Sequence, residues 1–224
     1  MMKKYAIYPI IMSVFALLGF VAVLILFSGA VEPLWGRMML LIIPALFLGT
    51  VAIFAAKGKL GVASTTALTT VLSVVLLLAS IFYTFLLSVW TSTTVTTDVR
   101  YYSRAYGQID DVKYVRNSFP KSIPSDAKDV KFSYSPQFLQ GGEVFELSYT
   151  TTADKIAEWK AKLEYRATWV GSNEKWCNEN GWSSDGIDAT RYQLYWNGGF
   201  NHGEICYVLI DESANRITFY YSVW

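Results

Sequence analysis

Residues 7–29 read IYPIIMSVFALLGFVAVLILFSG, and this stretch decides how the chain is organised. Its only polar side chains are those of Tyr8, Ser13 and Ser28. As a helix, about 23 residues rising about 1.5 Å each extend about 34 Å, which is enough to cross the hydrocarbon layer of a bilayer. Backbone amides in lipid must bond within their own segment, so we expect a membrane-spanning helix here.

Two further apolar stretches follow the first. Residues 38–56 contain no charged side chain, and residues 67–89 are interrupted only by hydroxyl residues and Tyr83. Serine and threonine hydroxyls can bond to the carbonyls of their own helix, so they are tolerated in lipid. The expected organisation is a membrane region with spans 7–29, 38–56 and 67–89 inside residues 1–90, a linker at 91–97 and an outer domain at 98–224.

Basic residues predict the orientation of the three spans. Lys3 and Lys4 precede the first span, and Lys57 and Lys59 lie between the second and the third. Because lysine and arginine are retained on the cytoplasmic side, we expect a cytoplasmic N-terminus and a C-terminal domain outside the plasma membrane. A cleaved signal peptide ending near residues 28–30 is the alternative for the first span, and it leaves the C-terminal domain outside as well.

The net charge of residues 91–224 limits the kinds of partner that we expect this part of the chain to bind. Residues 91–224 carry 14 basic and 17 acidic side chains, a net charge of −3. This balance indicates neither a nucleic-acid-binding surface nor a basic stripe for anionic lipid. The spans contain no internal charge, which favours an anchor over a transport path. The expected partners are the lipid bilayer and another membrane protein, cell-surface protein or glycan.

Hydrophobic patterns predict a mixed fold for the outer domain. Apolar and polar side chains alternate in residues 130–134 and 145–149, which is typical of half-buried strands. An apolar stripe predicts a long helix over residues 152–166, with Thr151 and Asp154 forming a capping box at its start.

The last third of the chain is rich in aromatic and branched residues, separated by glycine and asparagine turns. This pattern predicts a three-stranded meander at residues 191–196, 205–210 and 216–223. Short local connections favour antiparallel pairing. We therefore expect three N-terminal transmembrane helices followed by an α+β domain, with an antiparallel sheet of about five strands and one long helix packed on a face.

The two cysteines, Cys177 and Cys206, both lie in the part expected outside the cytoplasm. Extracytoplasmic space is generally oxidising, so we expect a disulfide between them. A pair of reactive or metal-binding thiols is the alternative. The single histidine of the chain leaves few nitrogen ligands for zinc, and we expect no metal and no cofactor.

Residues in the expected loops are the candidates for ligand binding. Trp176, Trp182 and Phe200 are aromatic side chains with few routes to burial in a loop, and His202 lies in the same expected loop as Phe200. Asp185 and Asp188 offer oxygen ligands to calcium, but their spacing does not match the calcium-loop pattern.

Sequence motifs for catalysis are missing from the chain. It has no Gly-x-Ser-x-Gly motif and no recognisable cysteine–histidine arrangement, so we expect that it is not an enzyme. The leading interpretation is a membrane-anchored cell-surface binding or interaction module. The alternatives are an accessory or regulatory subunit of another membrane protein, and an extracytoplasmic hydrolase built on His202 with Asp185 or Asp188.

One segment resembles known sequences. It comprises Phe119-Pro120-Lys121-Ser122-Ile123-Pro124, then Ala127, Val130, Phe132, Tyr134-Ser135-Pro136 and Phe138-Leu139-Gln140-Gly141-Gly142. This pattern resembles one in an uncharacterised family of membrane and lipoprotein-like proteins of Gram-positive bacteria, and the similarity extends to about Tyr149. The resemblance implies a bacterial cell-surface setting, and it implies no activity.

Overall fold

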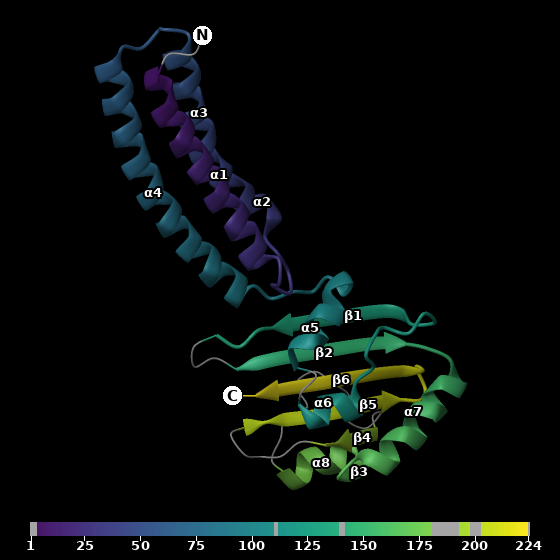
Figure 1. The fold of residues 1–224 in the computed structure, drawn as a ribbon. Helices are drawn as coiled ribbons and strands as arrows, with labels where there is room; N and C mark the ends of the chain where they lie inside the picture. Colours follow the sequence, from purple (N-terminus) through teal and green to yellow (C-terminus); the bar gives the residue numbers. More distant parts are fainter. Residues whose placement is uncertain (1–3, 110–111, 139–141, 181–192, 198–202, 224) are drawn as a thin grey trace. The chain divides into compact units, whose positions relative to one another are not determined.

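A computed structural model gives the fold of the protein (Figure 1). It describes residues 4–109, 112–138, 142–180, 193–197 and 203–223, with the backbone alone at residues 177, 179 and 180. The chain divides into two compact units, Met1–Ser92 and Thr93–Trp224, which are described separately below.

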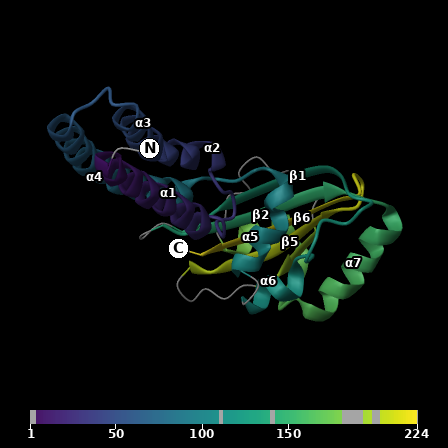
Figure 2. The same cartoon turned by 45° about the horizontal axis from the view of Figure 1, so that its top comes forward.

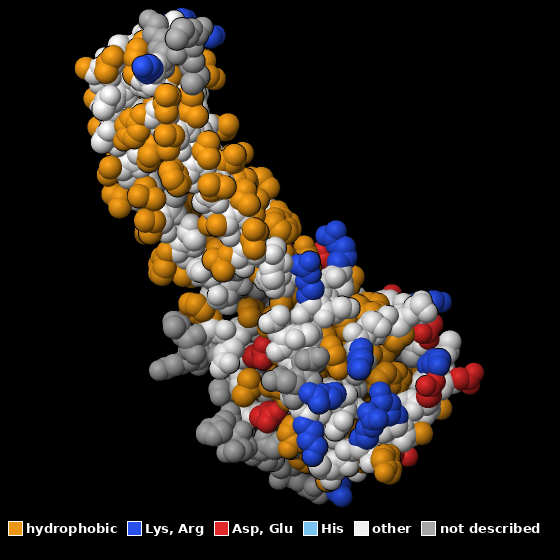
Figure 3. Space-filling view, in the orientation of Figure 1, with side chains coloured by type: hydrophobic (Ala, Val, Ile, Leu, Met, Phe, Trp, Pro, Cys, Tyr) orange, Lys and Arg blue, Asp and Glu red, His pale blue; other side chains and the backbone are white. Residues whose placement is uncertain are grey.

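The first unit consists of apolar helices. Its elements are η1 (Lys4–Ala6), α1 (Ile7–Phe27), α2 (Trp35–Met38), η2 (Met39–Ile42), α3 (Ile43–Ala56) and α4 (Val62–Thr93). Three continuous helical stretches are long and apolar enough to cross a membrane, namely Lys4–Phe27, Trp35–Ala56 and Val62–Thr93. Hydrophobic side chains cover the surface of this unit (Figure 3). The unit is therefore a membrane region, as the sequence predicts.

Helices α1 and α3 pack closely against each other. The Ser13 hydroxyl on α1 donates a hydrogen bond of 2.8 Å to the Ala45 carbonyl on α3. Gly49 lies beside this contact, and a Cβ added there would come within 3.4 Å of the Ser13 hydroxyl oxygen. Small residues thus bring the two helices together, which is the usual basis of helix association in lipid.

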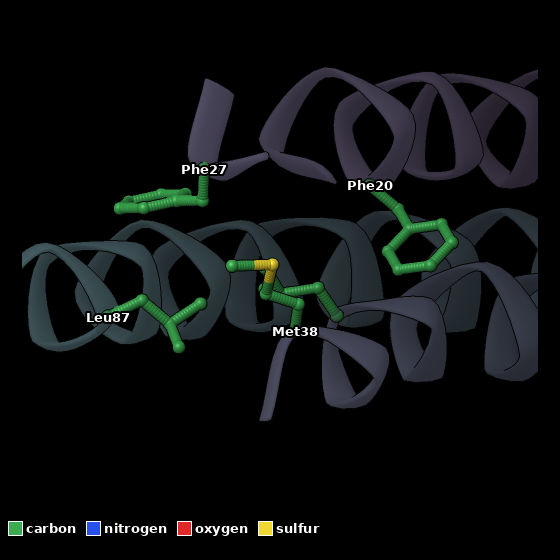
Figure 4. Packing of buried hydrophobic residues seen from close by; sticks show 5 residues of the cluster. Phe20, Phe27, Met38 and Leu87 are labelled. Atoms are coloured by element: carbon green, nitrogen blue, oxygen red, sulfur yellow. The ribbon is translucent and has the colours of Figure 1, made fainter. Parts of the chain in front are cut away.

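Helix α4 joins the other helices near its C-terminal end. Leu87 packs there with Phe20, Phe27, Met38 and Leu41 in a buried cluster (Figure 4).

Polar contacts reinforce this junction. The Tyr83 hydroxyl donates to the Arg37 carbonyl at 3.1 Å, and the Arg37 guanidinium lies 4.5 Å from the centre of the Trp90 ring. A cation over an aromatic face is attracted by the ring quadrupole. The loop between α1 and α3 is therefore fixed to α4 by both apolar and polar groups.

The second unit contains a six-stranded antiparallel sheet with helices. Its elements are η3 (Val99–Tyr101), α5 (Tyr102–Ile109), α6 (Lys113–Ser118), β1 (Lys128–Ser135), β2 (Glu143–Thr150), α7 (Ala153–Arg166), β3 (Trp169–Ser172), α8 (Asn173–Asn180), β4 (Gln193–Trp196), β5 (Ile205–Asp211) and β6 (Arg216–Val223). The strand order is β1-β2-β6-β5-β4-β3, and every neighbouring pair is antiparallel. The expected α+β architecture is confirmed.

Details of the second unit differ from expectation. Strand β3 and helix α8 add a sixth strand and another helix, and the segment before Pro120 forms two short helices, α5 and α6. The N-cap of α7 is Thr152, whose hydroxyl oxygen accepts from the Lys155 amide at 3.4 Å, so the predicted capping box was placed one residue too early. The Thr151 hydroxyl bonds to the Asp126 carboxylate instead.

One face of the sheet is covered by α5, α6 and α7 (Figure 2). Phe145 on β2 is fully buried beneath them, and its ring centre lies 5.3–6.0 Å from those of four other aromatic residues. These four are Tyr102, Phe119, Phe132 and Tyr134. The Trp159 ring of α7 packs on Phe219 of β6 on the same face, at 5.2 Å. We call this the helix-covered face.

We predict that Phe145→Ala lowers the free energy of unfolding by about 3–5 kcal/mol, because it removes a fully buried ring from the centre of this cluster. Denaturant unfolding of the detergent-solubilised full chain, followed by tryptophan fluorescence, measures the change. Tyr165→Ala is the control, because Tyr165 is 91% exposed and its replacement should change stability by less than about 0.5 kcal/mol. Equal effects of the two variants would contradict the described core.

Candidate functional site

The opposite face of the sheet carries an unusual run of aromatic side chains. It comprises Trp169, Trp176, Trp196, Tyr207 and Tyr220, which we call the aromatic row. Successive ring centres in this order are 4.8, 4.5, 6.3 and 4.9 Å apart. The last three contacts are stacked, with interplanar angles of 28°, 15° and 16°.

Strand register explains how residues so far apart in sequence form this row. Trp169 of β3 pairs with Trp196 of β4, Trp196 with Tyr207 of β5, and Tyr207 with Tyr220 of β6. Directly paired residues in a sheet project from the same face. Trp176 joins the row from α8, where it stacks on Trp196.

The inner part of the row is a packed cluster. Trp176 and Trp196 are 7% and 3% exposed, and they are buried together with Leu194 and Leu209. The expectation that Trp176 lies in a loop was therefore wrong, because it faces the sheet from helix α8. Its role in the structure is to pack α8 against the sheet.

The outer part of the row is accessible. Tyr207 and Tyr220 are half-buried, and their rings stack at 4.9 Å. Glu146 of β2 pairs directly with Tyr220, and Ser133 of β1 pairs with Glu146, so the aromatic row continues into polar side chains across the sheet.

The carboxyl group of Glu146, which lies where the aromatic row meets the polar side chains, has a raised pKa. Burial raises the pKa of its carboxyl above the ordinary value of 4.5, and the nearby Lys131 acts in the opposite direction. The carboxylate is thus partly desolvated while it remains accessible from solvent, which strengthens any hydrogen bond that it accepts. Tyr207, Tyr220 and Glu146 together offer ring surface next to a hydrogen-bond acceptor.

Such an arrangement can contact a ligand through both ring surface and a polar group. Aromatic side chains supply large contact area at low cost in conformational entropy, and a few polar groups fix the orientation of a ligand. Among the residues that the structure describes, no group of three or more histidine, cysteine, aspartate or glutamate side chains could hold a metal ion.

The outer surface of the helix layer is basic. Lys and Arg side chains gather over α5 and α6 (Figure 3). Five exposed basic residues lie in the described part of residues 98–126, and the first of them is ion-paired with Asp98: Arg100, Arg104, Lys113, Arg116 and Lys121. Residues 91–224, whose net charge is −3, therefore have a local excess of basic side chains over α5 and α6 (Figure 3).

The predicted disulfide is not supported. Cys206 is a free, fully buried cysteine on β5. It belongs to a buried polar contact in which the Asn197 side-chain amide donates to the Ser118 hydroxyl at 2.7 Å and the Asn197 backbone amide donates to the Cys206 carbonyl at 2.9 Å. Burial raises the pKa of the Cys206 thiol to about 12, with a hydrogen bond from Ser118 acting in the opposite direction.

The two faces of the sheet explain this result. Cys206 pairs with Tyr221, on the helix-covered face, whereas its neighbour Tyr207 belongs to the aromatic row on the opposite face. Helix α8, which contains Cys177, packs through Trp176 on the side of the aromatic row. Cys206 therefore faces away from the helix that contains its expected partner.

Other sequence candidates fall outside the described residues. These are Trp182, Asp185, Asp188, Phe200 and His202. The ligand-binding, calcium and hydrolase hypotheses that depend on them stay predictions.

Sequence reasoning missed Tyr207, Tyr220 and Glu146 as candidates. A signal was present, because strands β4, β5 and β6 have large apolar or aromatic residues at both odd and even positions. The pair Tyr220–Tyr221 is an example. Since successive strand residues point to opposite faces, such a pattern indicates a sheet with apolar groups on both sides.

Comparison with known proteins adds no further constraint. The chain matches no protein-family model, and it has no significant similarity to a curated protein sequence or to a solved structure.

We predict that the Cys206 thiol resists alkylation in the folded protein from pH 7 to pH 9. A thiol whose pKa is about 12 is ionised to only about one part in a thousand at pH 9, and the thiolate is the reactive form. Alkylation with iodoacetamide before and after denaturation, followed by peptide mass spectrometry, measures the labelling of Cys206. Rapid labelling in the folded state, or a Cys177–Cys206 linked peptide in samples trapped with acid, would contradict the buried free thiol.

Proposed function

We propose that this protein is a membrane-anchored binding module of the bacterial plasma membrane, with its second unit outside the cytoplasm. The observation that carries the proposal is the aromatic row, whose outer tyrosines lie next to a half-buried carboxylate. The proposed ligand surface consists of Tyr207, Tyr220 and Glu146. Its proposed ligand is a cell-surface glycan.

The chemistry of a sugar ring supports this choice of ligand. A pyranose ring has an apolar side formed by C–H groups and an edge of hydroxyl groups. The face of the Tyr220 ring that is turned away from Tyr207 can contact the first, and the Glu146 carboxylate can accept hydrogen bonds from the second. The stacking of Tyr207 on Tyr220 holds both rings in place before a ligand arrives, which reduces the entropy lost on binding.

The distribution of charge in the first unit supports the proposed location. Lys4, Lys57 and Lys59 lie at the end of the helices where α1 begins and where α3 connects to α4, whereas the opposite connection contains Glu32 and one basic residue, Arg37. Positive charge at one end favours retention of that end in the cytoplasm. The C-terminal end of α4 then leads to the outside.

We predict that Tyr220→Ala weakens glycan binding about 2- to 12-fold, which corresponds to the loss of about 0.5–1.5 kcal/mol for one aromatic contact. The full chain in detergent is titrated with soluble peptidoglycan fragments by isothermal calorimetry. Tyr165→Ala is the matched control, because it removes the same side chain from an exposed position on α7.

Equal binding by the wild type and the two variants would contradict the assignment of the ligand surface. Absence of any glycan binding by folded wild-type protein would contradict the proposed ligand class.

A second candidate is an accessory subunit of another membrane protein. Helix α4 favours it, because only Thr65, Thr69 and Leu87 are buried among its 32 residues, so most of its surface is free to contact lipid or another helix. This role requires a stoichiometric membrane partner after mild extraction. Capture of such a partner should survive Tyr220→Ala.

A further inference from the structure

A groove of about 560 Å³ lies within the first unit, between α1 and α4. Its walls are formed by one side of α1 between Tyr8 and Val23 and by one side of α4 between Thr70 and Thr84. Leu41 of η2 and Pro44 and Leu48 of α3 complete the lining. It lies along the part of the helices that the sequence predicts to be in the membrane.

The groove exists because α4 contacts the other helices at two separate levels. At one level the Tyr8 hydroxyl lies 3.3 Å from the Thr70 hydroxyl. At the other, Leu87 packs against Phe27 and Met38 (Figure 4). Between these levels Gly19 leaves open space, since a Cβ added there would meet no atom within 4 Å.

The lining is mostly apolar, although the buried Ser73 hydroxyl in it has no hydrogen-bond partner among the described residues. The Ser80 and Thr84 hydroxyls donate to the carbonyls of Leu76 and Ser80 in their own helix, at 2.7 and 2.8 Å. Hydroxyls bonded in this way present little polarity to a neighbouring molecule. The groove is therefore suited to hydrocarbon.

Its dimensions favour a single chain over a helix. From Tyr8 to Val23, α1 rises about 22 Å at about 1.5 Å per residue. Helices α1 and α4 touch near both ends of this length, so an α-helix with its side chains, which is about 10 Å wide, cannot lie between them. An extended acyl chain, the main component of the surrounding hydrocarbon, has the narrower form that the groove can enclose.

The charged residues at one end of the groove indicate which lipid headgroup would fit beside it. Lys57 and Lys59 are exposed in the turn before α4, and Lys4 is exposed just before α1, at the same end as the Tyr8–Thr70 contact. Basic side chains are visible at this end of the helices (Figure 3). The only acidic residue in the described part of the unit is Glu32, in the loop at the opposite end. Clustered lysines next to a membrane attract anionic headgroups.

We propose that this groove binds one acyl chain of an anionic phospholipid, with the headgroup placed among Lys4, Lys57 and Lys59. The lipid fills the space that α4 leaves beside α1 and links the two helices where they lack direct packing. It is thus a specific component of the membrane unit.

Native mass spectrometry of the full chain, reconstituted in nanodiscs containing equal amounts of phosphatidylglycerol and phosphatidylcholine and then released, tests the proposal. The wild type should retain one phosphatidylglycerol. Gly19→Phe should lower the retained fraction about tenfold, because a ring at this position occupies the groove. Gly36→Phe adds the same ring at an exposed position of α2 that also has open space, and it should retain the lipid as the wild type does.

A second variant tests the headgroup separately. Lys57→Gln combined with Lys59→Gln should reduce the preference for phosphatidylglycerol over phosphatidylcholine at least about threefold while a lipid is still retained. The proposal is overturned if the wild type retains no phospholipid, if it retains only a fatty acid, or if Gly19→Phe and Gly36→Phe retain lipid equally. It is also overturned if Gly19→Phe instead dissociates a dimer or a bound membrane protein, because the groove would then hold a helix.

Discussion

Successive side chains of a β-strand point to opposite faces of the sheet, and this constraint organises the second unit. On β5 it directs Cys206 and Val208 toward the helix-covered face and Tyr207 and Leu209 toward the aromatic row. The apolar side chains on both faces of β4, β5 and β6 must therefore be buried by other elements or must serve as a binding surface. The helices α5, α6 and α7 cover one face. On the other, α8 covers only part, and Tyr207 and Tyr220 remain half-buried beside Glu146.

The first unit follows a different constraint. The hydrocarbon layer contains no water that could hydrogen-bond to backbone amides, and apolar side chains gain little free energy by packing together in it. Helices form readily, but their association needs small residues or polar contacts. The pair α1–α3 has both, in Gly49 and the Ser13–Ala45 hydrogen bond. Helix α4 has a buried cluster around Leu87, a hydroxyl contact at Tyr83 beside that cluster and a second hydroxyl contact at Thr70. The groove between these contacts is a consequence of that uneven packing.

Periodicity predicted most of the fold because it reflects burial directly. The spans, the strands around Phe132 and Phe145, the helix α7 and the C-terminal meander all follow from it. The periodicity of apolar residues does not show which elements pack against each other in the folded chain. Neither Trp176 nor Cys177 carries a local signal for the face on which α8 packs, so the loop position of the first was predicted wrongly and the disulfide of the second is not supported. Glu146 was missed because its significance comes from its pairing with Tyr220, 74 positions later in the chain.

The central claim is that the second unit is held outside the cytoplasm by the helices of the first. Labelling of single cysteines in intact cells with a membrane-impermeant maleimide tests it most directly. Cys177 is replaced by serine, Cys206 is buried, and a new cysteine is placed at Tyr165, which is 91% exposed, or at Lys59, which is exposed in the turn before α4. We expect Tyr165→Cys to react in intact cells and Lys59→Cys to react only after permeabilisation. The reverse pattern, or protection of both sites until the cells are opened, would contradict the account.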